Sequence, residues 1–352
     1  MPSVFTIYNC GTAFHRRSPD VVARLWALNN PQADCHINDG PGSGTLKPVF
    51  MGGRKSPGGK KVAGMLFGGG VDANVMETIE VLRQMPVLPR TVNMVGWSRG
   101  AVTCTKISNL MFRMGGKMAA IKVNIFAIDP VPGTTPMGGD MWRLISLTPN
   151  VAYYNTVFAQ HDLRGHDNYF EPVYPTNYGL TDVDIDIMPG SHSSIVVFKG
   201  KRPEDNAELV YDLSKRFLMS HGTRFTDNTL MTANDILTRY GLIQQNYDVY
   251  TTLDGKALRN MAETVRVMKN SDKQTMGGMT GLRPRFFINA HHREVFRTQY
   301  PYLTNEIERD PPQTPFGPQW AQQWGRELDR VMAECVEQAK AVLAFSMRCR
   351  RE

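Results

Sequence analysis

Short apolar runs, rich in β-branched residues, alternate with helical patterns along the amino-terminal part of the chain. Runs of this kind predict strands, and they occupy residues 4–9, 91–97, 122–128, 151–159 and 182–188. Apolar residues spaced three or four apart predict helices at residues 73–84, 101–111 and 203–219. Asp72 is the expected N-cap of the first of these helices. Strands alternating with helices favour an α/β fold with a mostly parallel central sheet flanked by helices.

The pattern becomes irregular after residue 222. Helical pieces are predicted at 233–240 and 256–269, and a long helix at 319–351 carries one apolar stripe. We therefore divide the chain into an α/β domain, residues 1–222, and a mostly helical C-terminal region, residues 223–352, for a lid, docking or partner binding. Such an apolar stripe more commonly packs on the rest of the protein, here the α/β domain, and docking on a membrane surface is the alternative.

The segment Gly96-Trp97-Ser98-Arg99-Gly100 places G-x-S-x-G between a predicted strand and a predicted helix. In that context the motif is typical of the nucleophile elbow of the α/β-hydrolase fold, where a strained turn lifts the serine hydroxyl above the sheet. Side chains at Gly96 and Gly100 would clash with the neighbouring strand and helix. The N–H of Arg99 would face a developing oxyanion. We expect Ser98 to be the nucleophile of an ester hydrolase, with a structural turn as the alternative.

Polar residues also follow other predicted strands. Gly11 and Thr12 come after the first strand, where either N–H could be the second oxyanion donor; an ordinary turn is the alternative. Asp129 follows the strand at 122–128 and could hold a histidine in the required tautomer, or be a turn aspartate. His192 follows the strand at 182–188 in a turn of small residues, where a lone histidine is more often structural. The chain order Ser98, Asp129, His192 is that of α/β-hydrolases.

The composition is that of a globular protein, with 352 residues of which 41% are hydrophobic and 21% charged. The five cysteines are widely spaced without a C-x-x-C pair, which argues against a disulfide scaffold or a zinc site. His291 and His292 are expected in a loop or at the surface rather than as metal ligands. The glycine-rich tract at 38–71 lacks the phosphate-loop motif and is expected to be a mobile loop beside the site. The chemistry predicted here needs no cofactor and no metal.

The formal net charge is +7, which favours anionic partners such as lipid headgroups, nucleic acid or acidic proteins. The cations are scattered apart from Lys55–Lys61 and the terminal arginines, so a solvated basic surface is an equal alternative. No signal peptide and no apolar stretch of membrane-spanning length is visible. We expect a protein made in the cytoplasm without a cleaved signal, whose export would use a leaderless route to a target membrane.

Several segments match one family in order and relative position across about residues 4–198. They are Gly11-Thr12, Gly40-Pro41-Gly42-Ser43-Gly44-Thr45, Gly68-Gly69-Gly70-Val71-Asp72, Gly96-Trp97-Ser98-Arg99-Gly100-Ala101 and Met188-Pro189-Gly190-Ser191-His192-Ser193. In these segments the chain resembles the α/β-hydrolase domain of the Tle1-like phospholipases, the lipase effectors of the bacterial type VI secretion system. The family has G-F-S-R-G-A and F-P-G-x-H-S where the last two segments stand.

The resemblance implies that Ser98 is the nucleophile, His192 the base and Asp129 the acid, with Asp162 as the competing acid. It also implies a membrane phospholipid as the acyl-ester substrate, a role as an antibacterial or host-directed toxin, and an immunity protein and a secretion-tip carrier as partners. No nucleic-acid partner is expected. The alternatives are an esterase or thioesterase acting on another acyl substrate, and a non-catalytic interaction module on the same fold.

Overall fold

The structure of the chain is a computed structural model. It describes residues 3–43, 70–132, 146–162, 172–173, 175, 180–198, 204–245, 257–258, 292 and 295. The predicted helix at 319–351, most of the glycine-rich tract and the basic segment Lys55–Lys61 lie outside the described residues.

Six parallel strands form the central sheet, in the spatial order β2-β1-β3-β4-β5-β6. Their bounds are Val4–Asn9 (β1), Cys35–Asn38 (β2), Thr91–Trp97 (β3), Lys122–Ile128 (β4), Val151–Asp162 (β5) and Asp182–Ser191 (β6). A short strand, β7 (Ala257–Leu258), pairs antiparallel with β5. The predicted α/β fold with a mostly parallel sheet is confirmed.

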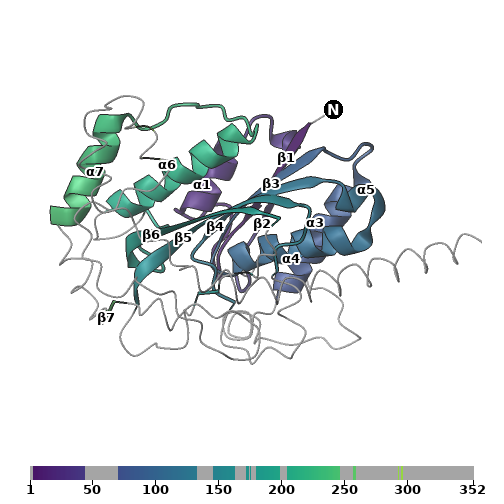
Figure 1. The fold of residues 1–352 in the computed structure, drawn as a ribbon, viewed down its shortest axis with the longest axis horizontal. Helices are drawn as coiled ribbons and strands as arrows, with labels where there is room; N and C mark the ends of the chain where they lie inside the picture. Colours follow the sequence, from purple (N-terminus) through teal and green to yellow (C-terminus); the bar gives the residue numbers. More distant parts are fainter. Residues whose placement is uncertain are drawn as a thin grey trace, which may run out of the picture.

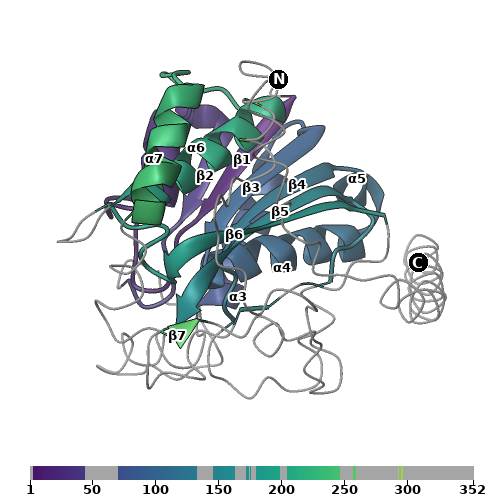
Figure 2. The ribbon, with the colours of Figure 1, turned by 60° about the vertical axis from the view of Figure 1, so that its left-hand side comes forward.

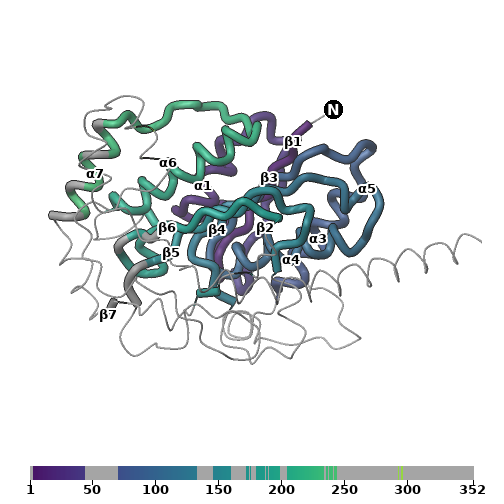
Figure 3. Tube along the Cα trace, in the orientation of Figure 1, coloured from purple at the N-terminus to yellow at the C-terminus, as the bar shows by residue number. Residues whose placement is uncertain are grey.

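Helices cover both faces of this sheet (Figures 1 and 2). On one face lie α1 (Val21–Leu28), α6 (Asp205–Ser220) and α7 (Ala233–Gln245), and on the other α3 (Val71–Gln84), α4 (Arg99–Met114) and α5 (Gly116–Ala119). A 3-10 turn, η1 (Gln32–Asp34), leads into β2. Figure 3 shows the same arrangement as a tube along the Cα trace.

Successive strand residues belong to two different cores, one on each side of the sheet. On β3, Met94 packs toward α3 and α4, whereas Val95 packs toward α1 and α6. On β4, Ile125 packs on the same side as Met94, and Phe126 on the same side as Val95. Side chains of a strand point alternately to opposite faces, so a strand buried on both faces is apolar at most positions. This explains why the central strands appear in the sequence as predominantly apolar runs, in which the buried Asn93 and Asn124 hydrogen-bond to each other.

Two helix predictions need correction. The N-cap of α3 is Gly70, and Asp72 lies in the first turn, where its carboxylate pairs with Lys106 at 2.7 Å. The left-handed backbone of Gly70, with φ of 109°, begins the helix without a side-chain cap. In the predicted helix at 256–269, Ala257 and Leu258 instead form β7, since they pair with the end of β5. The helix predicted at 233–240 is confirmed as α7.

The N-cap of α1 is a buried carboxyl group, Asp20. Its Oδ1 accepts the N–H groups of Val22 and Ala23 at 2.9 and 3.1 Å, while its buried Oδ2 has no hydrogen-bond partner among the described residues. Burial raises the pKa of Asp20 to about 7, although the two backbone hydrogen bonds act in the opposite direction. The folded protein therefore holds a proton here that the unfolded chain releases near pH 4.

We expect the Asp20→Asn variant to be more stable than the wild type at pH 8 and equally stable at pH 4. A raised pKa contributes stability that is full below the unfolded value and is lost as the pH rises through the folded value. A shift from 3.8 to about 7 bounds the gain at about 4 kcal/mol, and asparagine preserves the cap. Urea unfolding at the two pH values measures the difference. If the free energies of unfolding of Asp20→Asn and the wild type differed by the same amount at pH 4 and pH 8, the raised pKa of Asp20 would be contradicted.

Candidate functional site

Ser98 lies between β3, which ends at Trp97, and α4, which begins at Arg99. Its backbone has φ of 58° and ψ of −125°, which a residue with a side chain adopts only under strain. The Ser98 N–H donates to the carbonyl of Ile128 on β4 at 3.0 Å. The side chain is buried, with 5% of its surface exposed. The local geometry is thus the strand, strained turn and helix that the G-x-S-x-G motif predicts.

Glycines allow the backbone segments around this turn to come into contact. A Cβ atom at Gly96 would lie 2.5 Å from the carbonyl of Gly100, and one at Gly100 would overlap the carbonyl oxygen of Asn9. A Cβ at Gly11 would overlap the indole of Trp97, and one at Gly40 the carbonyl of Gly11. Only glycine fits these four positions without a shift of backbone or ring, which agrees with the expectation for Gly96 and Gly100.

Asp129 and His192 form a buried pair at the carboxyl ends of their strands. Asp129 follows β4, and its Oδ2 lies 2.5 Å from Nδ1 of His192, which follows β6. The other carboxylate oxygen, Oδ1, accepts the N–H of Ala159 on β5 at 3.1 Å. Asp129 is fully buried and His192 is 6% exposed. Because both carboxylate oxygens are engaged, the acid has one fixed orientation toward the imidazole.

The backbone at Asp129 is strained as well, with φ of 40°. Its N–H donates to the carbonyl of Val157 on the adjacent strand β5 at 2.8 Å. The loop from β6 therefore reaches over the end of β5 to meet an acid that follows β4. Non-glycine residues with positive φ are uncommon and concentrate at functional sites, and both Ser98 and Asp129 have this geometry.

Trp97 connects the histidine to the turn that carries Ser98. Its indole Nε1 donates to the backbone carbonyl of His192 at 3.2 Å, and the two rings lie 5.3 Å apart between centroids. Phe14 packs edge-on against the same indole, with 4.5 Å between the ring centroids. Since Trp97 precedes Ser98 directly, these contacts hold the imidazole at the same edge of the sheet as the serine.

The predicted oxyanion residues also lie at this edge. Gly11 and Thr12 form the turn after β1, and Arg99 is the first residue of α4, so its N–H has no partner within the helix. The Arg99 guanidinium donates from Nη1 to the Thr12 hydroxyl at 2.6 Å. The structure thus brings together the loops that carry all the predicted site residues after β1, β3, β4 and β6.

Asp162, the competing acid, is the last residue of β5, where it pairs with Ala257 of β7. Its side chain lies outside what the structure describes. Asp129 is the acid whose carboxylate contacts His192, so the geometry favours it over Asp162.

The expectation of a surface or loop position for His292 is wrong. His292 is fully buried, its Nε2 lies 3.0 Å from Oδ2 of Asp212, and its Nδ1 lies 3.1 Å from the hydroxyl of Tyr240. Because Asp212 lies on α6 and Tyr240 on α7, these contacts indicate that His292 packs against the two helices. Within the described part of the chain, no group of three histidine, cysteine or acidic side chains could hold a metal ion. His291 lies outside that part.

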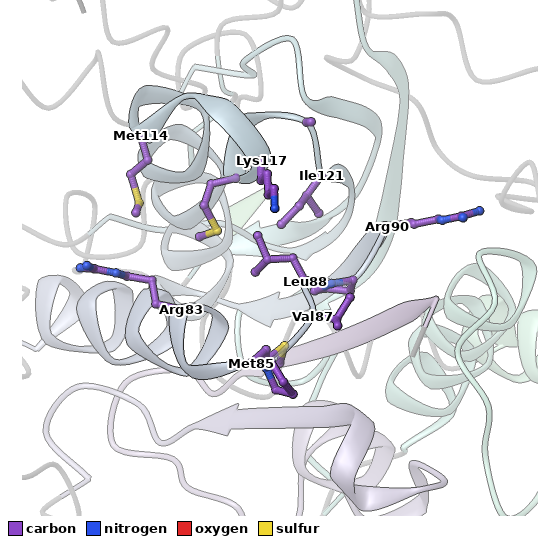
Figure 4. Close-up of a pocket in the computed structure, with 12 residues that line it drawn as sticks. Arg83, Met85, Val87, Leu88, Arg90, Met114, Lys117 and Ile121 are labelled. Carbon is purple, nitrogen blue, oxygen red and sulfur yellow. The ribbon is translucent and has the colours of Figure 1, made fainter. Parts of the chain in front are cut away.

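Two cavities among the described residues lie at the other edge of the sheet. One of about 690 Å³ is lined by residues before β3 and β4, among them Met85, Leu88 and Ile121 (Figure 4). A second, of about 480 Å³, is lined by Ser3 and Val4 at the start of β1 and by residues near Gly222. Neither lining contains Ser98, Asp129 or His192, and neither contains a nucleophile paired with a base. The candidate active site is therefore identified by the chemistry of its residues.

Two further sequence expectations concern thiols and membranes. The described cysteines, Cys10, Cys35 and Cys104, are free, and burial raises the pKa of the Cys104 thiol to about 12. None of the described helices has the length and apolar character needed to cross a bilayer.

Comparison with solved structures gives distant likenesses. No family model matches the chain, and no curated protein matches it. The chain is similar to an uncharacterized protein from Pseudomonas aeruginosa, with 12% identity and a TM-score of 0.43, over 93% of this chain and 62% of that one. It is also similar to the peroxisomal α/β-hydrolase Lpx1 of Saccharomyces cerevisiae, with 10% identity and a TM-score of 0.32, over 74% of this chain and 86% of that one. The chain thus spans less than two thirds of the first of these proteins.

Proposed function

We propose that the protein is a serine hydrolase that cleaves carboxylic esters through Ser98, His192 and Asp129. The observation that carries this proposal is the buried contact between Asp129 and His192 at the edge where the strained turn presents Ser98. A buried carboxylate on Nδ1 fixes the histidine tautomer and stabilises its cation, which is the role of the acid in a catalytic triad.

In the proposed mechanism, Asp129 keeps the proton on Nδ1 of His192, so that Nε2 is the basic nitrogen. Nε2 takes the Ser98 proton as the hydroxyl attacks the ester carbonyl, and the leaving alcohol then receives that proton. The acyl group remains on Ser98 until water, activated by the same imidazole, releases it as a carboxylate. The N–H groups of Arg99 and of Gly11 or Thr12 stabilise the oxyanion in both steps.

For the substrate, we propose the acyl ester of a membrane phospholipid. The resemblance to type VI lipase effectors favours it, and the net charge of +7 suits an anionic surface. The same resemblance supports the finer proposal of a secreted toxin with an immunity protein and a secretion-tip carrier. An esterase or thioesterase acting on another acyl group, and a non-catalytic module, are the outcomes that the following experiment separates.

The test uses the purified full chain. A fluorophosphonate probe should label the peptide that contains Ser98, and phospholipid vesicles should release fatty acid and lysophospholipid, both detected by mass spectrometry. If the protein cleaved acyl thioesters but not phospholipids, the proposed phospholipid substrate would be wrong and the proposed serine hydrolase would stand. No label together with no hydrolysis of any acyl substrate would leave only the non-catalytic module.

A further inference from the structure

Among the described residues, Arg99 is a buried cation without a carboxylate partner. The residue is 7% exposed, Nη1 donates to the Thr12 hydroxyl, and the buried Nε has no hydrogen-bond partner among the described residues. The other buried cations of the described chain differ in this respect. Lys106 pairs with Asp72 at 2.7 Å, and Lys215 lies 3.6 Å from Asp227.

An unpaired buried charge is costly, which is why lysine and arginine are rarely buried unless they are paired. Burial lowers the pKa of Arg99, but an arginine side chain stays protonated at neutral pH. The guanidinium therefore offers a full positive charge and an unused N–H group to whatever occupies this edge of the sheet. Structural packing alone would be served by a neutral side chain of similar length.

The surroundings of Arg99 strengthen its affinity for an anion. Arg99 is the first residue of α4, a helix of 16 residues whose first turn contains no acid, so its amino end carries an uncompensated partial positive charge. The hydroxyl of Thr12 accepts from Nη1 and keeps its own proton available to donate. The cation follows Ser98 directly, so a bound anion would lie beside the acyl group under attack.

We propose that Arg99 and Thr12 form a subsite for a singly charged oxyanion, a phosphodiester or a carboxylate, carried by the ester substrate next to its scissile carbonyl. This inference rests on the proposed hydrolase function and adds a basis for selecting among esters. The subsite discriminates against uncharged esters, because they leave the buried guanidinium without a partner.

The experiment compares kcat/KM on soluble esters that differ in one charge. Dihexanoylphosphatidylglycerol is paired with dihexanoylglycerol for the phosphodiester, and the 4-nitrophenyl monoester of glutaric acid with 4-nitrophenyl valerate for the carboxylate. We expect Arg99→Gln to lower kcat/KM about 10- to 100-fold more on the charged member of one pair than on its neutral partner. Arg99→Lys should recover part of that preference. The ester pair on which Arg99→Gln loses the preference for the charged member shows whether the bound anion is a phosphodiester or a carboxylate.

Arg83→Gln is the matched control, because it removes the same charge at the opposite edge of the sheet; its charged-to-neutral ratio should equal that of the wild type. An equal loss on charged and neutral esters in Arg99→Gln would overturn the subsite while leaving the hydrolase intact. Wild type that cleaves none of the esters would instead refute the proposed function, and the subsite with it.

A second measurement needs no variant. Dibutyl phosphate should inhibit neutral-ester cleavage by the wild type competitively, with an inhibition constant that rises with ionic strength. The absence of inhibition would also overturn a phosphodiester subsite.

Discussion

Replacing Ser98 with alanine should lower kcat for ester cleavage at least about 10⁴-fold, to the level left by the oxyanion donors and substrate binding alone. Alanine removes the attacking oxygen and leaves the imidazole without a proton to accept. The backbone φ of 58° disfavours both residues because each has a Cβ atom, so the variant should fold with nearly unchanged stability. Initial rates on a soluble acyl ester, with an active-site titration by fluorophosphonate, measure the loss.

Ser108→Ala provides the matched control for that experiment. Ser108 is a fully buried serine on α4, and its hydroxyl donates to the carbonyl of Thr105. Its loss should lower the free energy of unfolding by about 1 kcal/mol and leave kcat unchanged. A Ser98→Ala protein that keeps wild-type turnover, with its melting temperature intact, would show that another group is the nucleophile.

Replacing Asp129 with asparagine should lower kcat about 10³- to 10⁴-fold near neutral pH. The asparagine amide would donate to Nδ1 of His192, which favours the wrong tautomer, and the imidazolium would lose its counter-charge. The carbonyl of the new amide can still accept the N–H of Ala159, so the loop should keep its conformation. Because the base then carries no adjacent carboxylate, the remaining activity should rise toward higher pH, where hydroxide can replace the base.

Asp162→Asn separates the two candidate acids. If Asp129 is the acid, the Asp162 variant should retain turnover within a few-fold of the wild type, and the pH–rate profile should be unchanged. The opposite ranking of the two variants would transfer the role to Asp162 and would require the His192 side chain to turn away from its partner in the structure.

The sheet could be predicted because its strands are buried on both faces. The predominantly apolar runs at β1, β3, β4 and β5 need no alternation to be recognised, and each position after a strand falls at one edge of a parallel sheet. None of the three elements between β1 and residue 40, which are α1, η1 and β2, is predicted from the sequence. β2 has only four residues, two of them polar. The helix α1 buries Val21, Val22 and Ala23 in succession, which obscures a helical stripe, although Asp20 before it is a recognisable cap.

The sequence predicts Asp129 as the acid but leaves Asp162 as a competitor, because Asp129 follows β4 and Asp162 ends β5, and these strands are neighbours in the sheet. The structure adds the direction of the Asp129 side chain, which depends on the positive φ of this residue and on its bond to Ala159. The burial of His292 and the unpaired charge of Arg99 depend in the same way on contacts between residues far apart in the chain. No local pattern encodes such contacts.

The four glycines around the elbow make this region sensitive to added atoms rather than to lost ones. At Gly11, Gly40, Gly96 and Gly100, even one methyl group meets a backbone atom or the Trp97 ring, and rigid backbone cannot move aside as a flexible side chain can. Alanine should therefore be nearly as harmful there as leucine, whereas large core residues such as Phe126 should accept other apolar side chains. In a survey of random variants, intolerance of every substitution would mark the elbow, and tolerance graded by size would mark the core.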